Sequence, residues 1–202
     1  MLRRYRSAVV MPYPPCGVAS HAVPEVVIGI PVKPFPAAKR RLASVLDDTG
    51  RAVLGRRLAE RTVHAVLDAG AQPLVISADD PVTEWARSIG VDVLLDEGSS
   101  LDEAAKAAVG EARRREAAWG ILHADLPLLR ADDLQVAVSI LGDGGAVVAP
   151  SSDGGTSLVG SSLDRFAFSY GPGSFHRHLA ALAREDPRVI FTLGLALDLD
   201  TP

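Results

Sequence analysis

Hydrophobic and polar residues follow two alternating periods along most of the chain, beginning at Glu25. Short apolar runs typical of buried strands alternate with longer segments in which apolar residues recur every three or four positions, as they do in amphipathic helices. Strands are expected at residues 26–32, 74–77, 91–95 and 120–124, and helices at residues 37–46, 51–69, 81–89, 101–118 and 131–141. This alternation predicts an α/β fold with a mostly parallel, doubly wound sheet and helices on both faces.

The pattern changes after Gly145. Shorter strands are expected at residues 146–149 and 157–160, followed by a helix from about Ser174 and terminal strands up to Leu199. These segments predict a small β element added at the end of the sheet. Residues 1–24 lack either period and are rich in proline. We interpret them as a disordered extension, or an overcalled translation start, ahead of a single domain over residues 25–202.

Composition narrows the class of protein. A chain of 202 residues with 48% hydrophobic and 23% charged residues has enough apolar surface for one sizeable core. The formal net charge of -4 argues against broad nucleic-acid binding. A single cysteine, Cys16, excludes an internal disulfide and any multi-cysteine metal site. No apolar segment is long enough for a membrane span or a signal-peptide core, so a cytoplasmic enzyme is expected.

Asp125 is the first candidate for chemistry. It follows the apolar run of residues 119–124 and precedes Leu126 and Pro127, so we expect its carboxylate at the carboxyl end of a buried strand. Open α/β sheets bind their ligands at this edge, and an acid beside such a run is costly without a metal or a hydrogen-bonding partner. The alternative, a cap for the helix expected from Ala131, is disfavoured because Asp132 is better placed for that role.

A basic cluster follows the first expected strand. Four cations, Lys33, Lys39, Arg40 and Arg41, lie in the first loop and helix start of an acidic chain. Such a loop also presents backbone N–H groups to phosphate oxygens, so the cluster suits a polyphosphate. The glycine-rich dinucleotide and Walker patterns are absent, which argues against a Rossmann dehydrogenase and a P-loop kinase. The alternative is a solvated basic helix face.

Two acids stand near the end of the sequence, Asp198 and Asp200, separated by Leu199. On a strand, the side-chain period of two would direct both carboxylates to one face. Opposite Asp125 they would hold one or two Mg²⁺ ions, which prefer carboxylate and phosphate oxygens. Alternatively, Thr201 and Pro202 begin a helix whose start one of the aspartates supports.

Two glycine-rich segments, residues 151–157 and 168–178, form the third candidate cluster. Glycines let a ligand approach the backbone, and Ser174 is expected to cap a helix whose N-terminus attracts a second phosphate or carboxylate. This pattern predicts an acceptor pocket. The alternative is a pair of structural turns.

Taken together, these motifs resemble one family, the 2-phospho-L-lactate and phosphoenolpyruvate guanylyltransferases. The resemblance extends from about Val27 to the C-terminus and is carried by Pro31-Val32-Lys33, Ala38-Lys39-x-Arg41-Leu42, His123-Ala124-Asp125-Leu126-Pro127, Gly155-Thr156, Tyr170-Gly171-Pro172-Gly173-Ser174-Phe175 and Asp198-x-Asp200-Thr201-Pro202. It implies a nucleotidyltransferase fold and the activity of transferring GMP from GTP to a phosphorylated acceptor, with release of pyrophosphate. That reaction belongs to coenzyme F-420 biosynthesis, in which a downstream transferase accepts the labile product.

The resemblance also implies a role for each motif. Pro31, Lys33, Lys39 and Arg41 would bind the nucleotide, with Lys39 and Arg41 on its phosphates; Asp125, Asp198 and Asp200 would bind Mg²⁺; and Thr156, Gly171 and Ser174 would hold the acceptor. Relatives commonly carry Asn in place of Asp102, whose carboxylate can still accept hydrogen bonds from guanine. They also carry Asn in place of Ser157, which bears on acceptor identity.

The mechanism implied is attack of an acceptor phosphate oxygen on the α-phosphorus of GTP. This nucleophile is already an anion, so no general base is required, and His123 is expected to be a packed, hydrogen-bonded residue. The residues leave open whether the acceptor is phosphoenolpyruvate, 2-phospho-L-lactate or 3-phosphoglycerate. The alanine- and arginine-rich composition, similar to that of high-GC bacterial members, favours phosphoenolpyruvate. A homodimer is also left open.

Two rival functions make different demands on the sequence. A related nucleotidyltransferase acting on a sugar phosphate or molybdopterin would carry a Leu-x-Gly-Gly first loop, which this chain lacks. A non-catalytic nucleotide-binding regulator would have lost the metal-binding carboxylates. All three aspartates are present, which favours an enzyme.

Overall fold

A seven-stranded sheet forms the centre of the computed structural model, which describes residues 25–37, 40–96 and 100–199. The predicted extension over residues 1–24 lies outside this range. The strand order is β3-β2-β1-β4-β6-β5-β7, in which β6 alone runs antiparallel to its neighbours. The strands are β1 (Val26–Pro31), β2 (Gln72–Ser77), β3 (Asp92–Leu95), β4 (Ala118–Leu122), β5 (Val147–Pro150), β6 (Thr156–Ser161) and β7 (Arg188–Val189). The predicted mostly parallel α/β fold is confirmed, and the later strands join the same sheet.

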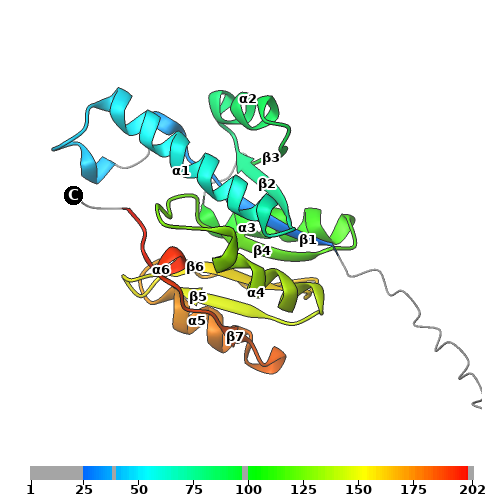
Figure 1. Ribbon diagram of the computed structural model, residues 1–202. Coiled ribbons are helices and arrows are strands. Elements are labelled where there is room, and N and C mark those ends of the chain that lie inside the picture. Colours follow the sequence, from blue (N-terminus) through cyan, green and yellow to red (C-terminus); the bar gives the residue numbers. More distant parts are fainter. Residues whose placement is uncertain (1–24, 38–39, 97–99, 200–202) are drawn as a thin grey trace, which may run out of the picture.

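Helices cover both faces of the sheet (Figure 1). They are α1 (Asp48–Asp68), α2 (Asp80–Ser88), α3 (Leu101–Arg114), α4 (Ala131–Gly142), α5 (Ser174–Ala181) and α6 (Leu193–Ala196), with 3-10 turns η1 (Phe35–Ala37), η2 (Arg40–Leu42) and η3 (Ala183–Glu185). Apolar residues of α1, α2, α4 and α6 form one core cluster with one face of the sheet. Residues of α3 and the segment around α5 form the other. Successive residues of β1 alternate between these clusters, as the period-two pattern requires.

Side-chain caps determine where the first helices begin. The Asp47 carboxylate accepts the Gly50 N–H at 2.7 Å at the start of α1, and Asp79 and Ser100 cap α2 and α3 in the same way. Such caps satisfy backbone donors that have no partner within the helix. They place the start of α1 at Asp48, close to the sequence prediction.

Three predicted elements differ from the structure. The helix expected over residues 37–46 is replaced by η1 and η2 among the described residues, because prolines at 34 and 36 disfavour a continuous helix and Asp47 caps α1. The helix expected over residues 101–118 ends at Arg114, and β4 begins at Ala118. The expected terminal strands are reduced to the two residues of β7, followed by α6.

The strand order creates a switch point between β1 and β4. From β1, the chain adds β2 on one side and, after β3, places β4 on the other. The crossover from β1 to β2 carries α1 on one face of the sheet, and the crossover from β3 to β4 carries α3 on the other. In open α/β sheets, ligands bind beyond the carboxyl ends of the strands at such a switch point.

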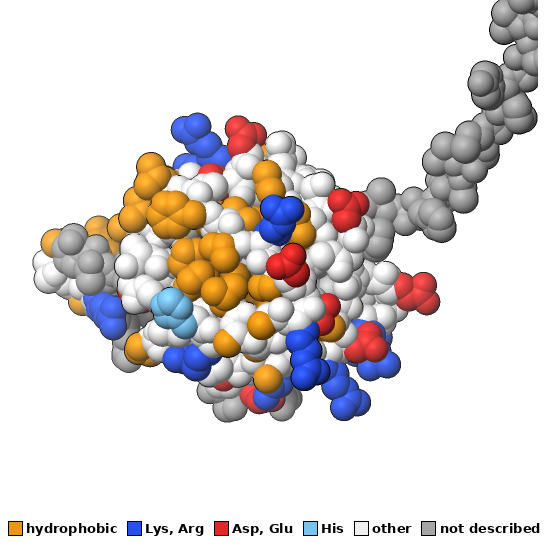
Figure 2. All heavy atoms as spheres, turned by 90° about the horizontal axis from the view of Figure 1, so that it is seen from below, with side chains coloured by type: hydrophobic (Ala, Val, Ile, Leu, Met, Phe, Trp, Pro, Cys, Tyr) orange, Lys and Arg blue, Asp and Glu red, His pale blue; other side chains and the backbone are white. Residues whose placement is uncertain are grey.

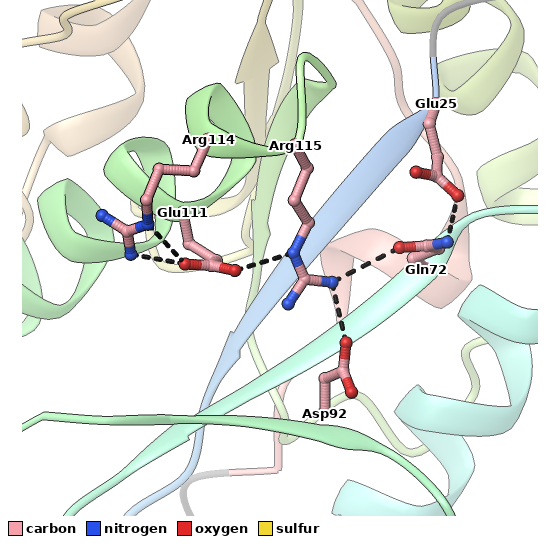
Figure 3. Close-up of polar contacts among 6 residues, drawn as sticks. All are labelled: Glu25, Gln72, Asp92, Glu111, Arg114 and Arg115. Carbon is pink, nitrogen blue, oxygen red and sulfur yellow. Dashed lines mark hydrogen bonds and ion pairs between the residues drawn. The ribbon is translucent and has the colours of Figure 1, made fainter.

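The amino ends of the strands are closed by a polar network (Figure 3). Arg115, at the end of α3, donates to Glu111 at 2.8 Å, to Asp92 at 2.8 Å and to Gln72 at 3.4 Å. Gln72 in turn donates to Glu25, and Arg114 donates to the second oxygen of Glu111. This network ties α3 to the beginnings of β1, β2 and β3.

Apolar side chains gather on the surface seen from the side of α5 and β7 (Figure 2). In the segment after η3, the largest exposed apolar side chains are those of Val189, Phe191 and Leu193. Among the described residues, no helix is long and apolar enough to cross a membrane.

Candidate active site

Asp125 lies three residues beyond the end of β4, near the switch point. The predicted strand over residues 120–124 ends earlier, at Leu122, and the next residue, His123, donates its backbone N–H to the Ser157 carbonyl at 3.0 Å. Asp125 does not cap α4, because that helix starts at Ala131 and Asp133 accepts the Arg130 N–H at 2.9 Å. The Asp125 side chain is 29% exposed. The carboxylate predicted to stand at the carboxyl edge of the sheet is therefore there, in the loop that joins β4 to α4.

The C-terminal segment passes directly beside Asp125. The Leu199 N–H donates to the Asp125 carbonyl at 3.1 Å, and the Ser152 N–H donates to the Ala196 carbonyl at 2.8 Å. Asp198 follows α6 and does not lie on a strand. The expectation that Asp198 lies on a strand is therefore wrong, because α6 precedes it where terminal strands were expected; the convergence of the Asp198 and Asp200 carboxylates stays a prediction. Asp200 lies outside the described residues.

Backbone hydrogen bonding nevertheless brings the Asp198 segment to Asp125. Both residues take part in interactions within the protein, and both carry carboxylates, the donors that hard divalent cations prefer. Within the described ranges no group of three or more His, Cys, Asp or Glu residues is placed to hold a metal ion. The donor chemistry of the Asp125 and Asp198 carboxylates fits a divalent ion whose remaining ligands come from substrate phosphates or water.

The basic loop follows β1, the strand that pairs with β4 at the switch point. The Val32 N–H donates to the Ile76 carbonyl at 3.0 Å, and the Ser77 hydroxyl donates to the Val32 carbonyl at 2.8 Å. Phe35 is buried against Trp85, with ring centroids 5.6 Å apart. The loop is thus fixed at its base, immediately after Pro31.

The structure describes some of the cations of this loop and not others. Lys33 and Arg41 are exposed, and Arg41 already interacts within the protein. Lys39 lies outside the described residues. The prediction that this loop binds polyphosphate therefore rests on its charge and on its position after β1.

Thr156 and Ser174, predicted to hold an acceptor, are in direct contact. Thr156 is the first residue of β6 and Ser174 the first of α5, and their hydroxyl oxygens lie 3.0 Å apart with both residues buried. The N-cap of α5 is Gly173, not Ser174, and it has a φ of 71°, which glycine adopts without steric cost. Gly171 also has a positive φ, of 106°. The expectation that Ser174 is a cap was wrong by one position, because its side chain turns toward Thr156.

His178 contacts Thr156 of this pair, and the sequence analysis did not predict it as a site residue. Its Nδ1 lies 3.0 Å from the Thr156 hydroxyl, and its Nε2 accepts the Ser169 N–H at 3.0 Å. The only signal in the sequence was its spacing, since residues four apart share one helix face and His178 follows Ser174 by that interval.

Burial keeps His178 neutral. The residue is fully buried, and the Phe166, Phe168 and Tyr170 rings pack against its imidazole. Burial lowers the pKa of His178 to about 4; Asp102 opposes this shift, whereas Arg177 and His123 add to it. An imidazole in this environment acts as one donor and one acceptor at neutral pH.

Tyr170 links the Asp125 loop to this buried cluster. Its ring lies 5.6 Å from that of His123 and 4.8 Å from that of His178. The Tyr170 hydroxyl and His123 Nε2 are buried and have no hydrogen-bond partner among the described residues, and burial raises the pKa of Tyr170. His123 is packed as expected, and its Nδ1 lies 4.0 Å from Asp125 Oδ1; the expected hydrogen bond to its side chain stays a prediction. Close to Asp125, the described residues thus leave two buried polar atoms, His123 Nε2 and the Tyr170 hydroxyl, without a partner.

Asp102 lies at the same cluster, in the first turn of α3. Its Oδ1 accepts the Tyr170 backbone N–H at 2.9 Å, so one carboxylate oxygen holds the 168–174 segment. Arg177 holds the same segment from α5, donating to the Ser169 and Pro172 carbonyls at 2.9 and 2.8 Å. The predicted role of Asp102 in reading guanine remains a prediction, and its second oxygen is the group that would carry it.

Ser157, a position at which the family resemblance implies Asn, is buried within the sheet. Its hydroxyl donates to the Ala149 carbonyl of β5 at 3.3 Å. The neighbouring turn is fixed by Asp153, whose carboxylate accepts the Ser151 hydroxyl at 2.6 Å and the Gly155 N–H at 2.8 Å. These two bonds, the Ser151 bond first, hold the pKa of Asp153 below its usual range.

Three sets of groups therefore meet at one edge of the sheet. At this edge lie the basic loop after β1, the Asp125 loop after β4 and the Thr156–Ser174 pair at the start of β6. The adjacent parallel strands β1 and β4 end here, and β6 begins here because it runs antiparallel to β4. Carboxylates between two regions suited to anions can hold a cation that joins two phosphate groups. This arrangement suits transfer between two phosphorylated substrates.

Comparison with known proteins gives a consistent result. Residues 26–201 match the profile of the family described as guanylyl transferase CofC like. The chain is 39% identical over 184 residues to the phosphoenolpyruvate guanylyltransferase of Rubrobacter xylanophilus, covering 86% of this chain and 88% of the relative. It is 26% identical over 175 residues to the 2-phospho-L-lactate guanylyltransferase of Methanobrevibacter smithii, covering 85% and 78%. A nucleotide-diphospho-sugar transferase-like structure from Desulfovibrio desulfuricans G20 superposes with a TM-score of 0.70 at 21% identity, covering 88% of this chain and 83% of that one.

Proposed function

This chain belongs to the family of CofC-like guanylyl transferases, and on that premise we propose that it transfers GMP from GTP to phosphoenolpyruvate and releases pyrophosphate. The observation that carries the proposal is the meeting of Asp125, the basic loop after β1 and the Thr156–Ser174 pair at one edge of the sheet. Phosphoenolpyruvate is preferred as the acceptor because the 39% identical relative bears that name, whereas the relative named for 2-phospho-L-lactate is 26% identical.

In the proposed reaction, a phosphate oxygen of the acceptor attacks the α-phosphorus of GTP. A new P–O bond forms between the two phosphates, and the bond from the α-phosphorus to the bridging oxygen of pyrophosphate breaks, so that pyrophosphate leaves with the electron pair. No proton is removed from the nucleophile, because the phosphate is ionised at neutral pH. The rate must then come from positioning and from neutralisation of charge.

The residues of the site divide this task. Lys39 and Arg41 would take up the charge that develops on the departing pyrophosphate, and Pro31 and Lys33 would line the nucleotide side. Thr156, Gly171 and Ser174 would orient the acceptor. Asp125 with Asp198 or Asp200 would hold Mg²⁺, which when bound draws the two phosphate groups together and withdraws electron density from them.

The proposal places the protein in coenzyme F-420 biosynthesis in the cytoplasm. Its product joins two phosphates in an anhydride and is labile, so a downstream transferase would consume it. 2-Phospho-L-lactate is the alternative acceptor, since a relative bears that name and the two acceptors differ only in the carbon skeleton beside the same phosphate and carboxylate.

The test is an assay of the purified protein with GTP, Mg²⁺ and one acceptor at a time, coupled to the downstream transferase. Phosphoenolpyruvate, 2-phospho-L-lactate and 3-phosphoglycerate are compared by kcat/KM, with ATP and CTP replacing GTP in parallel reactions. We expect the highest kcat/KM with GTP and phosphoenolpyruvate. Pyrophosphate release that does not depend on any of these acceptors would contradict the proposal.

A further inference from the structure

Three buried side chains form a continuous line of hydrogen bonds from α5 to the start of β6. His178 Nδ1 contacts the Thr156 hydroxyl at 3.0 Å, and the Thr156 hydroxyl contacts the Ser174 hydroxyl at 3.0 Å. All three residues are at most 1% exposed. A buried polar chain of this kind is stable only when each donor meets an acceptor, so its direction can be worked out.

The direction is set at Ser169. The Ser169 backbone N–H can only donate, and it donates to His178 Nε2 at 3.0 Å. That nitrogen therefore carries no proton, and the proton of the neutral imidazole sits on Nδ1. Nδ1–H must then donate to the Thr156 oxygen. The Thr156–Ser174 bond can run in either direction, and the direction in which Thr156 donates is the one that leaves the Ser174 hydroxyl proton for a ligand.

With Thr156 donating, the line of bonds ends at the Ser174 hydroxyl, whose proton has no acceptor among the described residues. In that arrangement Ser174 Oγ accepts from Thr156 and its own hydroxyl proton points away from the line, and no further hydrogen bond of this hydroxyl exists among the described residues. The adjoining Gly171 and Pro172 are exposed, and Gly171 has the positive φ that glycine adopts without strain. The buried Ser174 hydroxyl therefore lies next to a turn at the surface.

We propose that His178 is a positioning residue that fixes the Ser174 hydroxyl as a hydrogen-bond donor to the carboxylate of the phosphorylated acceptor. The inference rests on the proposed function, and it extends that function by naming the group that sets the polarity of the acceptor pocket. A donor at this position favours a carboxylate over an amide, because an amide would also have to place its own N–H groups beside donors. His178 itself touches no substrate.

The two ring nitrogens of His178 can be tested separately. In His178→Asn the amide nitrogen takes the place of Nδ1, so the bond to Thr156 is kept and the bond from Ser169 is lost. In His178→Gln the amide reaches the place of Nε2, so the Ser169 bond is kept and the bond to Thr156 is lost. His176→Asn is the matched control, because His176 is exposed on the same helix and its ring packs against that of Phe175, away from Thr156 and Ser169.

The readouts are the KM for phosphoenolpyruvate and the KM for GTP, measured on variants with native circular dichroism and unfolding midpoints. We expect His178→Gln to raise the acceptor KM roughly five- to tenfold, the effect of one lost neutral hydrogen bond, with the GTP KM within about twofold of the wild-type value. His178→Asn should restore the acceptor KM to within about twofold. His176→Asn should change neither value. An unchanged acceptor KM in His178→Gln, or an equal rise in both KM values, would overturn the inference.

A substrate-free measurement separates this inference from the proposed function. Long-range proton–nitrogen NMR of the wild-type protein at neutral pH is expected to show His178 protonated at Nδ1 only. A proton on Nε2 would overturn the inference even in an active enzyme. Failure of the wild-type protein to use any acceptor, with the Nδ1 proton observed, would instead overturn the proposed function and with it the substrate role of the relay.

Discussion

The two ends of the sheet treat polar groups in opposite ways. At the amino ends of β1, β2 and β3, Arg115 binds Glu111, Asp92 and Gln72, so each charge meets a partner from the protein (Figure 3). At the carboxyl ends, His123 Nε2 and the Tyr170 hydroxyl are buried without a partner among the described residues. Closed networks stabilise, whereas unsatisfied buried groups cost free energy unless a ligand completes them. The difference supports the proposal that the chemistry takes place at the carboxyl end, without reference to any relative.

The largest effect should follow from Asp125→Asn. This change keeps the shape of the side chain but removes the charge that would bind Mg²⁺, so we expect kcat to fall by about 100-fold or more. The free energy of unfolding should change little, because the side chain is partly exposed. Asp92→Asn, at the closed end of the sheet, is the matched control and should leave kcat unchanged. Near wild-type turnover of Asp125→Asn at modest Mg²⁺ would make Asp125 structural.

Lys39→Ala should have the next largest effect on activity. Loss of a charge that supports the departing pyrophosphate costs about 3 kcal/mol in the transition state, or roughly 100-fold in kcat/KM for GTP. Steady-state kinetics at saturating acceptor measure it. Lys106→Ala, which removes an exposed lysine paired with Glu103 on α3, should have no effect. If Lys39→Ala changed only the acceptor KM, the assignment of the basic loop to the nucleotide would be wrong.

Acid should destabilise the carboxyl end through His178. The pKa of His178 is lowered by burial from 6.5 to about 4, so below pH 6.5 the unfolded chain binds a proton that the folded protein does not. Stability is therefore complete above pH 6.5 and is lost as the pH falls toward 4. Between pH 7 and pH 4.5, the contribution of this residue is about 2 to 3 kcal/mol.

Urea unfolding of the wild type and of His178→Gln at both pH values measures this contribution. The wild type should lose more stability between the two pH values than the variant does, because other acidic groups titrate equally in both. Equal losses would mean that the pKa of His178 is the same in the folded and the unfolded protein.

Ser174→Ala should act more weakly and on the other substrate. It removes one neutral hydroxyl, worth on the order of 1 kcal/mol, so the acceptor KM should rise roughly five- to tenfold while the GTP KM stays constant. Ser162→Ala, which removes an exposed hydroxyl bonded to the Gly144 carbonyl, is the control. A change in the GTP KM alone would refute the division into two anion pockets.

The smallest effect is expected at the amino ends of the strands, where the Arg115 network lies. Arg115→Gln removes ion pairs at the rim of the sheet, where Asp92 is 64% exposed, and such pairs contribute at most about 1 kcal/mol to stability. Thermal unfolding should show a modest decrease, and kcat should be unchanged. A large loss of activity would show that the two ends of the sheet are coupled.

The sequence predicted this site unevenly, for physical reasons. Asp125 was found because an apolar run and a proline mark a strand end locally, and the alternation of periods determined the sheet. The C-terminal geometry was predicted wrongly, because three apolar residues before Asp198 fit either a strand or the short helix α6. His178 was missed because its role depends on Thr156 and Ser169, which reach it only through the tertiary fold.

The reversed direction of β6 has a consequence for engineering. Because β6 begins at the active edge, Thr156 is reached through the 151–155 turn, whose ends are held by the pairing of Pro150 with Thr156. Surface turns tolerate changes of length and sequence better than strands do. Libraries randomised in this turn would therefore reshape the acceptor pocket while β1, β2 and β4 keep their register. Acceptor range should be selectable independently of the nucleotide.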